Sequence, residues 1–220
     1  MSPLIRFDRV TVISREKTLL SDISFSLYPG EKAAVCGKSG SGKSTMLKTL
    51  LGLHVIKQGT VYFQEKPLTP ASVHSIRSCS AYIGQEPVLA AESVRDALLV
   101  PFQFKTHREH RPTEAQLIEV LQRLQLPTDI LSQNSNRISG GEKQRIALAR
   151  GLLLGKKLYL LDEVTSALDA KSKHAVFDVF SDPQLTVVSV AHDPEWLERC
   201  GLVFELEAGR LTQVRRNGNT

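Results

Sequence analysis

A glycine-rich stretch near the start of this 220-residue chain has the residue types and spacing needed to bind phosphate. It consists of Gly37, Lys38, Ser39, Gly40, Ser41, Gly42, Lys43, Ser44 and Thr45. The stretch matches the phosphate-loop pattern G-x-x-x-x-G-K-[ST] at every fixed position. Its glycines let the backbone wrap around a phosphate chain with the N–H groups pointing inward. We expect Lys43 to add a full positive charge and the Ser44 hydroxyl to bind Mg²⁺.

The sequence on either side of this stretch supports the same interpretation. Residues 32–36 are predicted to form a short buried strand, and residues 44–51 a helix. A helix N-terminus carries a partial positive charge that attracts anions. An ordinary Gly/Ser-rich loop is the alternative, and this context disfavours it. We therefore expect the chain to bind a nucleoside triphosphate.

A second group of candidate residues follows the apolar run of residues 158–161. Such a run is expected of a central parallel strand that is buried on both faces. At its end, Asp162 is well placed to bind Mg²⁺, and Glu163 can orient or deprotonate an attacking water. When this pair is considered alone, a plain strand end is an equal alternative.

A third feature is the sequence Ser139-Gly140-Gly141-Glu142, which starts a predicted helix that continues to residue 154. A serine and glycines at a helix start can bind an anion through backbone N–H groups, so this would be a second anion site. A structural helix cap is the alternative, and it explains the serine but not both glycines.

The remaining pattern predicts strands and helices in one compact domain of residues 1–220. Strands are predicted over residues 4–12, 24–27, 60–63, 80–83, 185–190, 203–206 and 211–214, and a helix is predicted after Asp193. From residue 93 to 131 the periodicity is helical, with a capping box at Thr113 and Gln116. We therefore predict that residues from about 87 to 155 form a helical subdomain inside an α/β core.

Composition and charge restrict the kind of partner. The net charge of +5 is modest and Lys and Arg are spread along the chain, so we do not expect nucleic-acid binding. The three cysteines are odd in number and lack C-x-x-C spacing, which predicts free thiols in a cytosolic protein. No signal peptide is evident, and no apolar run reaches the roughly 18 residues of a spanning helix. Any membrane role is therefore expected to act through a partner.

The order of these motifs along the chain resembles that of the ATP-binding subunits of ABC transporters. Gln85 follows a predicted strand between the phosphate loop and the serine-glycine motif, and residues 166–169 (Ser-Ala-Leu-Asp) follow the acidic pair. His192 at another strand end completes the order. The resemblance covers nearly the whole chain and implies a P-loop NTPase core with a mostly parallel sheet. It also implies an N-terminal antiparallel β part and an inserted helical subdomain.

The resemblance implies a role for each of these residues. Ser44, Gln85 and Asp162 would bind Mg²⁺, and Gln85 would also contact the attacking water. Glu163 would be the general base, and Lys43 and His192 would act on the phosphates. Ser139, Gly140, Gly141, Glu142 and Asp169 would serve the ATP held by a second copy. The implied assembly is a head-to-tail homodimer that forms only with ATP.

Two features depart from the family's pattern. Glu142 stands where many members carry glutamine, which is a tolerated variant. Residues 13–17 contain no aromatic side chain to stack on adenine. We therefore expect Ile13 or Arg15 to pack against the base.

The resemblance implies an ATPase that drives an integral membrane permease from the cytoplasmic face of the bacterial inner membrane. Within the family, the chain is most similar to bacterial iron-export ATPase subunits of the Fet type, through residues 94–98, 101–103 and 126–131 among others. We therefore expect iron export, with the permease docking on the apolar side chains of residues 86–104. The six histidines are scattered, so the permease is expected to set the specificity.

Other functions are alternatives. The chain could serve another ABC transporter, for amino acids, lipids or drugs. A soluble ABC protein without a transport role is a further alternative, but such proteins usually carry two ATPase halves or a long coiled-coil insertion. A P-loop nucleotide kinase would leave the serine-glycine motif and His192 unexplained.

Overall fold

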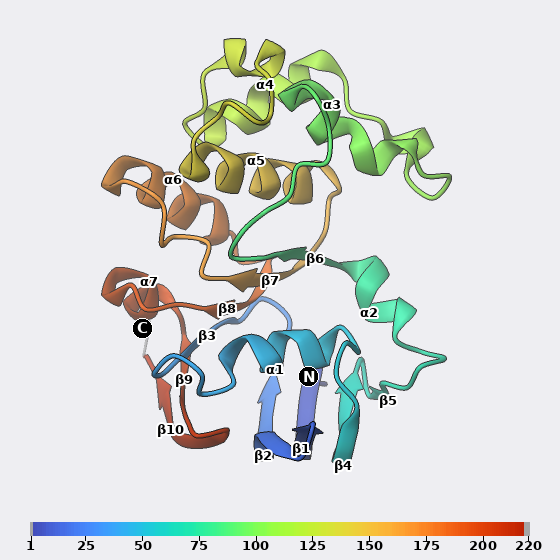
Figure 1. Cartoon of the computed structure of the whole chain (residues 1–220), viewed down its shortest axis with the longest axis vertical. Helices are drawn as coiled ribbons and strands as arrows, with labels where there is room; N and C mark the ends of the chain where they lie inside the picture. Colours follow the sequence, from blue (N-terminus) through green and yellow to red (C-terminus); the bar gives the residue numbers. More distant parts are fainter. Residues whose placement is uncertain (1, 218–220) are drawn as a thin grey trace. The chain divides into compact units, whose positions relative to one another are not determined.

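The computed structural model describes residues 2–217, which pack into two compact units (Figure 1). The first unit contains residues 2–80, 157–162 and 183–217, and the second contains residues 81–156 and 163–182. The first unit holds two β-sheets and the second unit is mostly helical, which confirms the predicted α/β class. Among the described helices, none has the length and apolar character that crossing a membrane requires.

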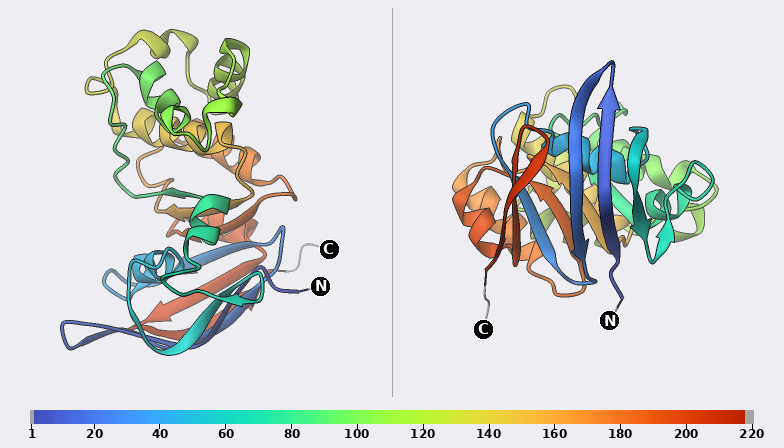
Figure 2. Two further views of the ribbon diagram at one scale, coloured as in Figure 1. Left: turned by 90° about the vertical axis from the view of Figure 1, so that its right-hand side faces the viewer. Right: turned by 90° about the horizontal axis from the view of Figure 1, so that it is seen from below.

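The first unit begins with an antiparallel sheet whose strand order is β2-β1-β4-β5. Its strands are β1 (Ile5–Ser14), β2 (Lys17–Leu27), β4 (Ile56–Phe63) and β5 (Lys66–Pro67) (Figure 2). The predicted apolar set of β1 is buried, and the implied N-terminal antiparallel part is confirmed. β2 is longer than the predicted strand over 24–27. The prediction was too short because Asp22, with φ of 54°, interrupts the alternation in the middle of the strand.

The second sheet of this unit contains the parallel strands that the sequence predicted. In order across the sheet, its strands within the first unit are β10 (Arg210–Arg216), β9 (Leu202–Glu207), β3 (Lys32–Cys36), β8 (Thr186–Val190) and β7 (Leu158–Asp162). Strands β9, β3, β8 and β7 run parallel, and β10 returns antiparallel to β9. Every residue of β7 and β8 is buried, as expected of strands that are covered on both faces.

Three helices belong to the first unit. They are α1 (Lys43–Leu50), α2 (His74–Cys79) and α7 (Pro194–Arg199). Met46, Leu47 and Leu50 of α1 are fully buried in the core that both sheets share. α7 begins after Asp193 as predicted, whereas α2 was not predicted.

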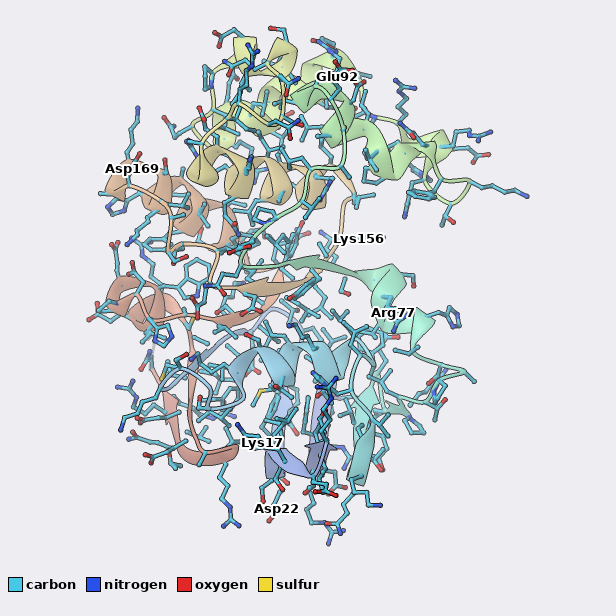
Figure 3. All side chains as sticks on the ribbon, in the orientation of Figure 1. Lys17, Asp22, Arg77, Glu92, Lys156 and Asp169 are labelled. Carbon is cyan, nitrogen blue, oxygen red and sulfur yellow. The ribbon has the colours of Figure 1, made fainter. Side chains whose placement is uncertain are left out.

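The second unit is built around helices. β6 (Ser80–Ile83) leads into it, followed by α3 (Val94–Leu99), η1 (Val100–Gln103), η2 (Arg108–His110), α4 (Glu114–Arg123), η3 (Thr128–Ser132), α5 (Gly140–Leu153) and α6 (Ala170–Phe180). The predicted capping box of α4 forms, with the Thr113 N–H donating to Gln116 Oε1 at 2.8 Å. α6 was not predicted from the sequence. It starts after Asp169, which caps it by accepting from the Ser172 N–H at 2.8 Å (Figure 3).

The turn between β9 and β10 supports the phosphate loop. The Gly209 N–H donates to the carbonyl of Ser41 at 3.0 Å, and the Gly209 carbonyl accepts from the Ser21 N–H at 2.8 Å. Gly209 has φ of +79°, and a Cβ at this position would lie 2.7 Å from the carbonyl oxygen of Leu19. Only glycine meets both requirements without strain.

We expect Gly209→Ala to lower the free energy of unfolding by about 2 kcal/mol, because the left-handed backbone and the backbone clash both oppose a methyl group. Urea denaturation measures this change. Gly201→Ala is the matched control, since a Cβ there would meet open space, and its effect should stay below about 0.5 kcal/mol. Equal losses in the two variants would contradict a specific role of the turn.

Candidate functional site

The phosphate loop joins β3 to α1 and leaves the first turn of α1 uncapped. Its N-cap residue is Gly42, with φ of 105°, and no side chain within residues 2–217 caps this helix start. In contrast, helices α3, α4, α5, α6 and α7 are capped by Ser93, Thr113, Ser139, Asp169 and Asp193. The N–H groups at the start of α1 therefore suit an anionic ligand.

Two side chains inside the loop also fit a phosphate ligand. Lys43 is only 6% exposed, and its Nζ donates to the carbonyl oxygens of Gly37 at 2.9 Å and Lys38 at 3.0 Å. The Ser41 hydroxyl is buried and has no hydrogen-bond partner among the described residues. A buried cation and an unpartnered buried hydroxyl are both stabilised when an anion binds beside them.

Ser44 and Asp162 bring two predicted Mg²⁺ ligands together. The Ser44 hydroxyl donates to Asp162 Oδ1 at 2.9 Å. Asp162 is the last residue of β7 and is 4% exposed. Hydroxyl and carboxylate oxygens are the hard ligands that Mg²⁺ prefers, so this pair fits the ion.

The register of the second sheet aligns three strand ends at this site. Val35 of β3 and Asp162 of β7 both pair with Val190 of β8, which lies between them. The phosphate loop begins at Gly37, two residues after Val35, and His192 lies two residues after Val190. The sheet therefore carries His192, which is exposed, at the edge where the phosphate loop and Asp162 lie.

In the second unit, Gln85 and Glu163 form a hydrogen-bonded pair. Gln85 Nε2 donates to Glu163 Oε2 at 3.1 Å. Glu163 has φ of 53°, a left-handed conformation that is costly for a residue with a Cβ. Its carbonyl accepts from the Ser166 N–H at 3.2 Å, which closes the turn after β7. The chain thus bends sharply after Asp162, and the hydrogen bond from Gln85 orients the Glu163 carboxylate.

Ser139 caps α5 through a reciprocal arrangement with Glu142. The Glu142 N–H donates to Ser139 Oγ at 3.3 Å, while the hydroxyl and the N–H of Ser139 both donate to Glu142 Oε2 at 2.7 Å. The hydrogen bond from the Ser139 hydroxyl, and then that from its backbone, lower the pKa of Glu142. The helix cap considered as an alternative is therefore present, and glutamate at position 142 completes the capping box.

Next to this cap is a hollow of about 380 Å³. It is lined by Ser139, Gly140, Gly141, Arg145, Ala167, Leu168, Asp169 and Ser172. A Cβ on Gly141 would lie 2.9 Å from the carbonyl oxygen of Ala167, whereas a Cβ on Gly140 would meet nothing within 4 Å. Packing thus explains Gly141 but not Gly140. The structure brings the serine-glycine motif and Asp169 together around one concave surface.

Two polar side chains of α5, whose contacts were not predicted from the sequence, hold the loop that contains Gln85. Gln144 is 2% exposed, and its Nε2 donates to the carbonyl of Gly84 at 3.3 Å. Arg150 donates to the carbonyls of Val88 at 3.3 Å and Leu89 at 3.4 Å, and burial lowers its pKa. The available signal was the presence of polar residues on the buried face of a helix, where they need partners.

The residues expected to pack against adenine lie at a hairpin tip in the first unit. Arg15 and Glu16 form the turn between β1 and β2, with φ of 46° and 67°. Ile13 is 40% exposed at the end of β1. Contact of Ile13 or Arg15 with adenine stays a prediction.

Comparison with known proteins agrees with this geometry. Residues 20–166 match the family described as "ABC transporter". The "Probable iron export ATP-binding protein FetA" of Escherichia coli strain K12 is 35% identical, over 97% of this chain and 96% of that protein. The "Mycobactin import ATP-binding/permease protein IrtB" of Mycolicibacterium smegmatis is 33% identical over 96% of this chain, which spans 38% of that longer protein.

A solved structure shares the fold. It is described as "Dimeric structure of a post-hydrolysis state of the ATP-binding cassette MJ0796 bound to ADP and Pi". The TM-score is 0.83 at 23% identity, over 98% of this chain and 100% of the other, and at this identity the likeness establishes the fold. Together with the sequence match over residues 20–166, it shows that this chain belongs to the ABC transporter family, as one of its ATP-binding domains.

Proposed function

We propose that this chain hydrolyses ATP and thereby drives an integral membrane permease, with residues 1–220 acting as one nucleotide-binding domain. The observation that carries the proposal is the hydrogen bond between Ser44 and Asp162 beside the uncapped start of α1. This arrangement places oxygen ligands for Mg²⁺ next to N–H groups that suit phosphate.

The residues of the site have distinct tasks in the proposed reaction. The N–H groups of the phosphate loop and the Lys43 ammonium bind the phosphates and offset their charge. Ser44, Asp162 and Gln85 would hold Mg²⁺, which supplies further positive charge to the phosphates when bound. Glu163, oriented by Gln85, would accept a proton from the attacking water. His192 would bind the terminal phosphate.

We further propose that two copies pair head to tail around ATP. The hollow beside Ser139 belongs to the second unit, whereas the phosphate loop belongs to the first. In the pair, the Ser139 hydroxyl would exchange its bond to Glu142 for one to the partner's nucleotide. Packing inside the chain does not require a glycine at position 140. The absence of a side chain there would instead allow the partner's nucleotide to approach the backbone closely. The structure of MJ0796, described as dimeric and bound to ADP and Pi, supports the pairing of two copies.

The permease partner would hold the chain at the cytoplasmic face of the bacterial inner membrane. IrtB supports such a partner, because its description joins an ATP-binding part to a permease part. The expected docking stretch, residues 86–104, offers less apolar surface than its sequence indicates. Its side chains at 89, 94, 98, 99 and 102 are buried in the described structure, while Val88 is 75% and Phe104 64% exposed. We therefore propose that the permease contact includes Val88.

Iron export is the transport activity that we propose. Its support is the 35% identity to FetA over nearly the full length of both chains. IrtB, described as importing mycobactin, is 33% identical, so chains with different substrates and transport directions have similar identity to this one. We therefore propose that the permease sets the substrate and the direction of transport.

Glu163→Gln should keep nucleotide binding but lower ATP turnover by about 10²–10⁴-fold, the usual contribution of general-base catalysis. The substitution preserves side-chain size and a hydrogen bond to Gln85. Because ATP would persist, the variant should form an ATP-dependent dimer on size-exclusion chromatography. Turnover close to that of the wild type would reject Glu163 as the base. As a control, Lys43→Ala should weaken binding of a fluorescent nucleotide instead.

Substitutions at Ser139 separate helix capping from a role toward the partner's nucleotide. Ser139→Asp keeps an N-cap oxygen but sets its carboxylate against Glu142 Oε2, which lies 2.7 Å from Ser139 Oγ, so its stability should fall by about 1 kcal/mol. A carboxylate facing phosphate should in addition abolish the ATP-dependent dimer. The matched control is Thr113→Ala, which removes the cap of α4 and should cost about 1 kcal/mol of stability without affecting the dimer. An intact dimer in Ser139→Asp would leave capping as the only role of Ser139.

Deletion of this gene should raise cellular iron and lower survival when the strain grows with excess iron and peroxide, because export would be lost. Cellular iron is measured by elemental analysis, and the deletion is complemented with either the wild-type gene or the Glu163→Gln variant. Only the wild type should restore survival. Unchanged iron content and survival in the deletion strain would reject iron export and leave the ATPase proposal standing.

A further inference from the structure

The segment from Phe104 to Arg111, which we name the basic segment, presents cations and one large apolar side chain to solvent. Its residues are Phe104, Lys105, Thr106, His107, Arg108, Glu109, His110 and Arg111. All of them are exposed except His107, which is half-buried. Phe104 is 64% exposed, which is unusual for an aromatic residue that could have packed against its own unit.

The basic segment has a defined conformation in the second unit. It follows the turn η1, whose Phe102 is 3% exposed and anchors the chain in the core. The carbonyl of Phe104 accepts from the N–H groups of His107 at 3.0 Å and Arg108 at 3.1 Å, and the short turn η2 follows. The hydrogen-bonded backbone of these turns therefore fixes Phe104 in its exposed position.

Positive charge from other elements lies next to this segment. Burial lowers the pKa of His107, and the nearby charges of Lys156 and His110 lower it further. Lys156 lies at the end of the segment that follows α5 (Figure 3). Arg123 of α4 shares with His110 the lining of a surface hollow, which Glu119 also lines. Five Lys and Arg side chains in or near the basic segment, namely Lys105, Arg108, Arg111, Arg123 and Lys156, thus outnumber the carboxylates of Glu109 and Glu119, while Glu114 is paired with Arg95.

We propose that the basic segment lies on the anionic lipid headgroups of the membrane that holds the permease, with Phe104 in the interfacial layer. This inference rests on the proposed function, because the permease contact around Val88 belongs to the same unit as the basic segment and would hold that unit near the membrane. Lipid headgroups complement the excess of cations. Phe104 finds its matching environment at the boundary between headgroups and acyl chains.

Vesicle co-sedimentation of the purified full chain tests the proposal. The wild type should bind vesicles of phosphatidylcholine and phosphatidylglycerol in equal parts and should not bind vesicles of phosphatidylcholine alone. The triple variant Lys105→Gln, Arg108→Gln and Arg111→Gln should bind on the order of 100-fold more weakly, at about fivefold for each cation. Phe104→Ser should weaken binding severalfold and leave its salt dependence unchanged.

A second triple variant controls for net charge. Arg9→Gln, Lys57→Gln and Lys66→Gln also remove three exposed cations, but from the first unit, and should leave vesicle binding within about twofold of the wild type. Replacement of Arg108 and Arg111 by lysine should likewise retain binding. Equal losses in the two glutamine triples would overturn the proposal, because binding would then follow net charge alone.

Nucleotide binding separates this inference from the proposed function. Both glutamine triples should bind a fluorescent ATP analogue as the wild type does. Failure of the wild type to bind anionic vesicles, with nucleotide binding intact, rejects the lipid contact alone. Tighter binding to duplex DNA than to vesicles, lost in the first triple variant, would assign the basic segment to nucleic acid and overturn the lipid assignment.

Discussion

The alignment of strand ends in the second sheet is the constraint on which the site depends. β3, β8 and β7 run parallel with Val35, Val190 and Asp162 in one row, so the chain leaves all three strands at the same edge. A slip of β7 by one residue would separate the Asp162 carboxylate from the Ser44 hydroxyl, 2.9 Å away. The register is stable because every side chain of β7 and β8 is buried, and a slip would disrupt that packing.

Two helix starts show opposite solutions to the problem of unpaired N–H groups. In α5, Ser139 and Glu142 satisfy these groups within the chain. In α1, the N-cap residue Gly42 has no side chain that could accept from these N–H groups, and its left-handed φ of 105° leads the loop directly into the helix. Capping contributes about 1 kcal/mol to a helix, so its omission at α1 is a cost that anion binding can offset.

The sequence predicted those parts of the fold and site that depend on local pattern. The apolar run of β7 and the glycine spacing of the phosphate loop each determine their own structure, and the family match agrees with both. β2 was predicted too short because the irregularity at Asp22 hides its alternation. Gln144 and Arg150 were missed since their partners, the carbonyls of Gly84, Val88 and Leu89, are at least 60 residues away along the chain. No spacing rule connects a side chain to a distant backbone carbonyl.

α5 links the parts of the second unit that the proposed transporter uses. Gln144 and Arg150 tie this helix to the loop around Gln85, while its first turn borders the hollow beside Ser139. Breaking the bond of Gln144 would leave a buried amide unsatisfied, at a cost of about 1–3 kcal/mol. We therefore expect any displacement of the loop around Gln85 to be transmitted to α5. A permease that displaces Val88 would act on Arg150 through the carbonyl of Val88, and in this way on the helix that starts at Ser139, without touching the nucleotide.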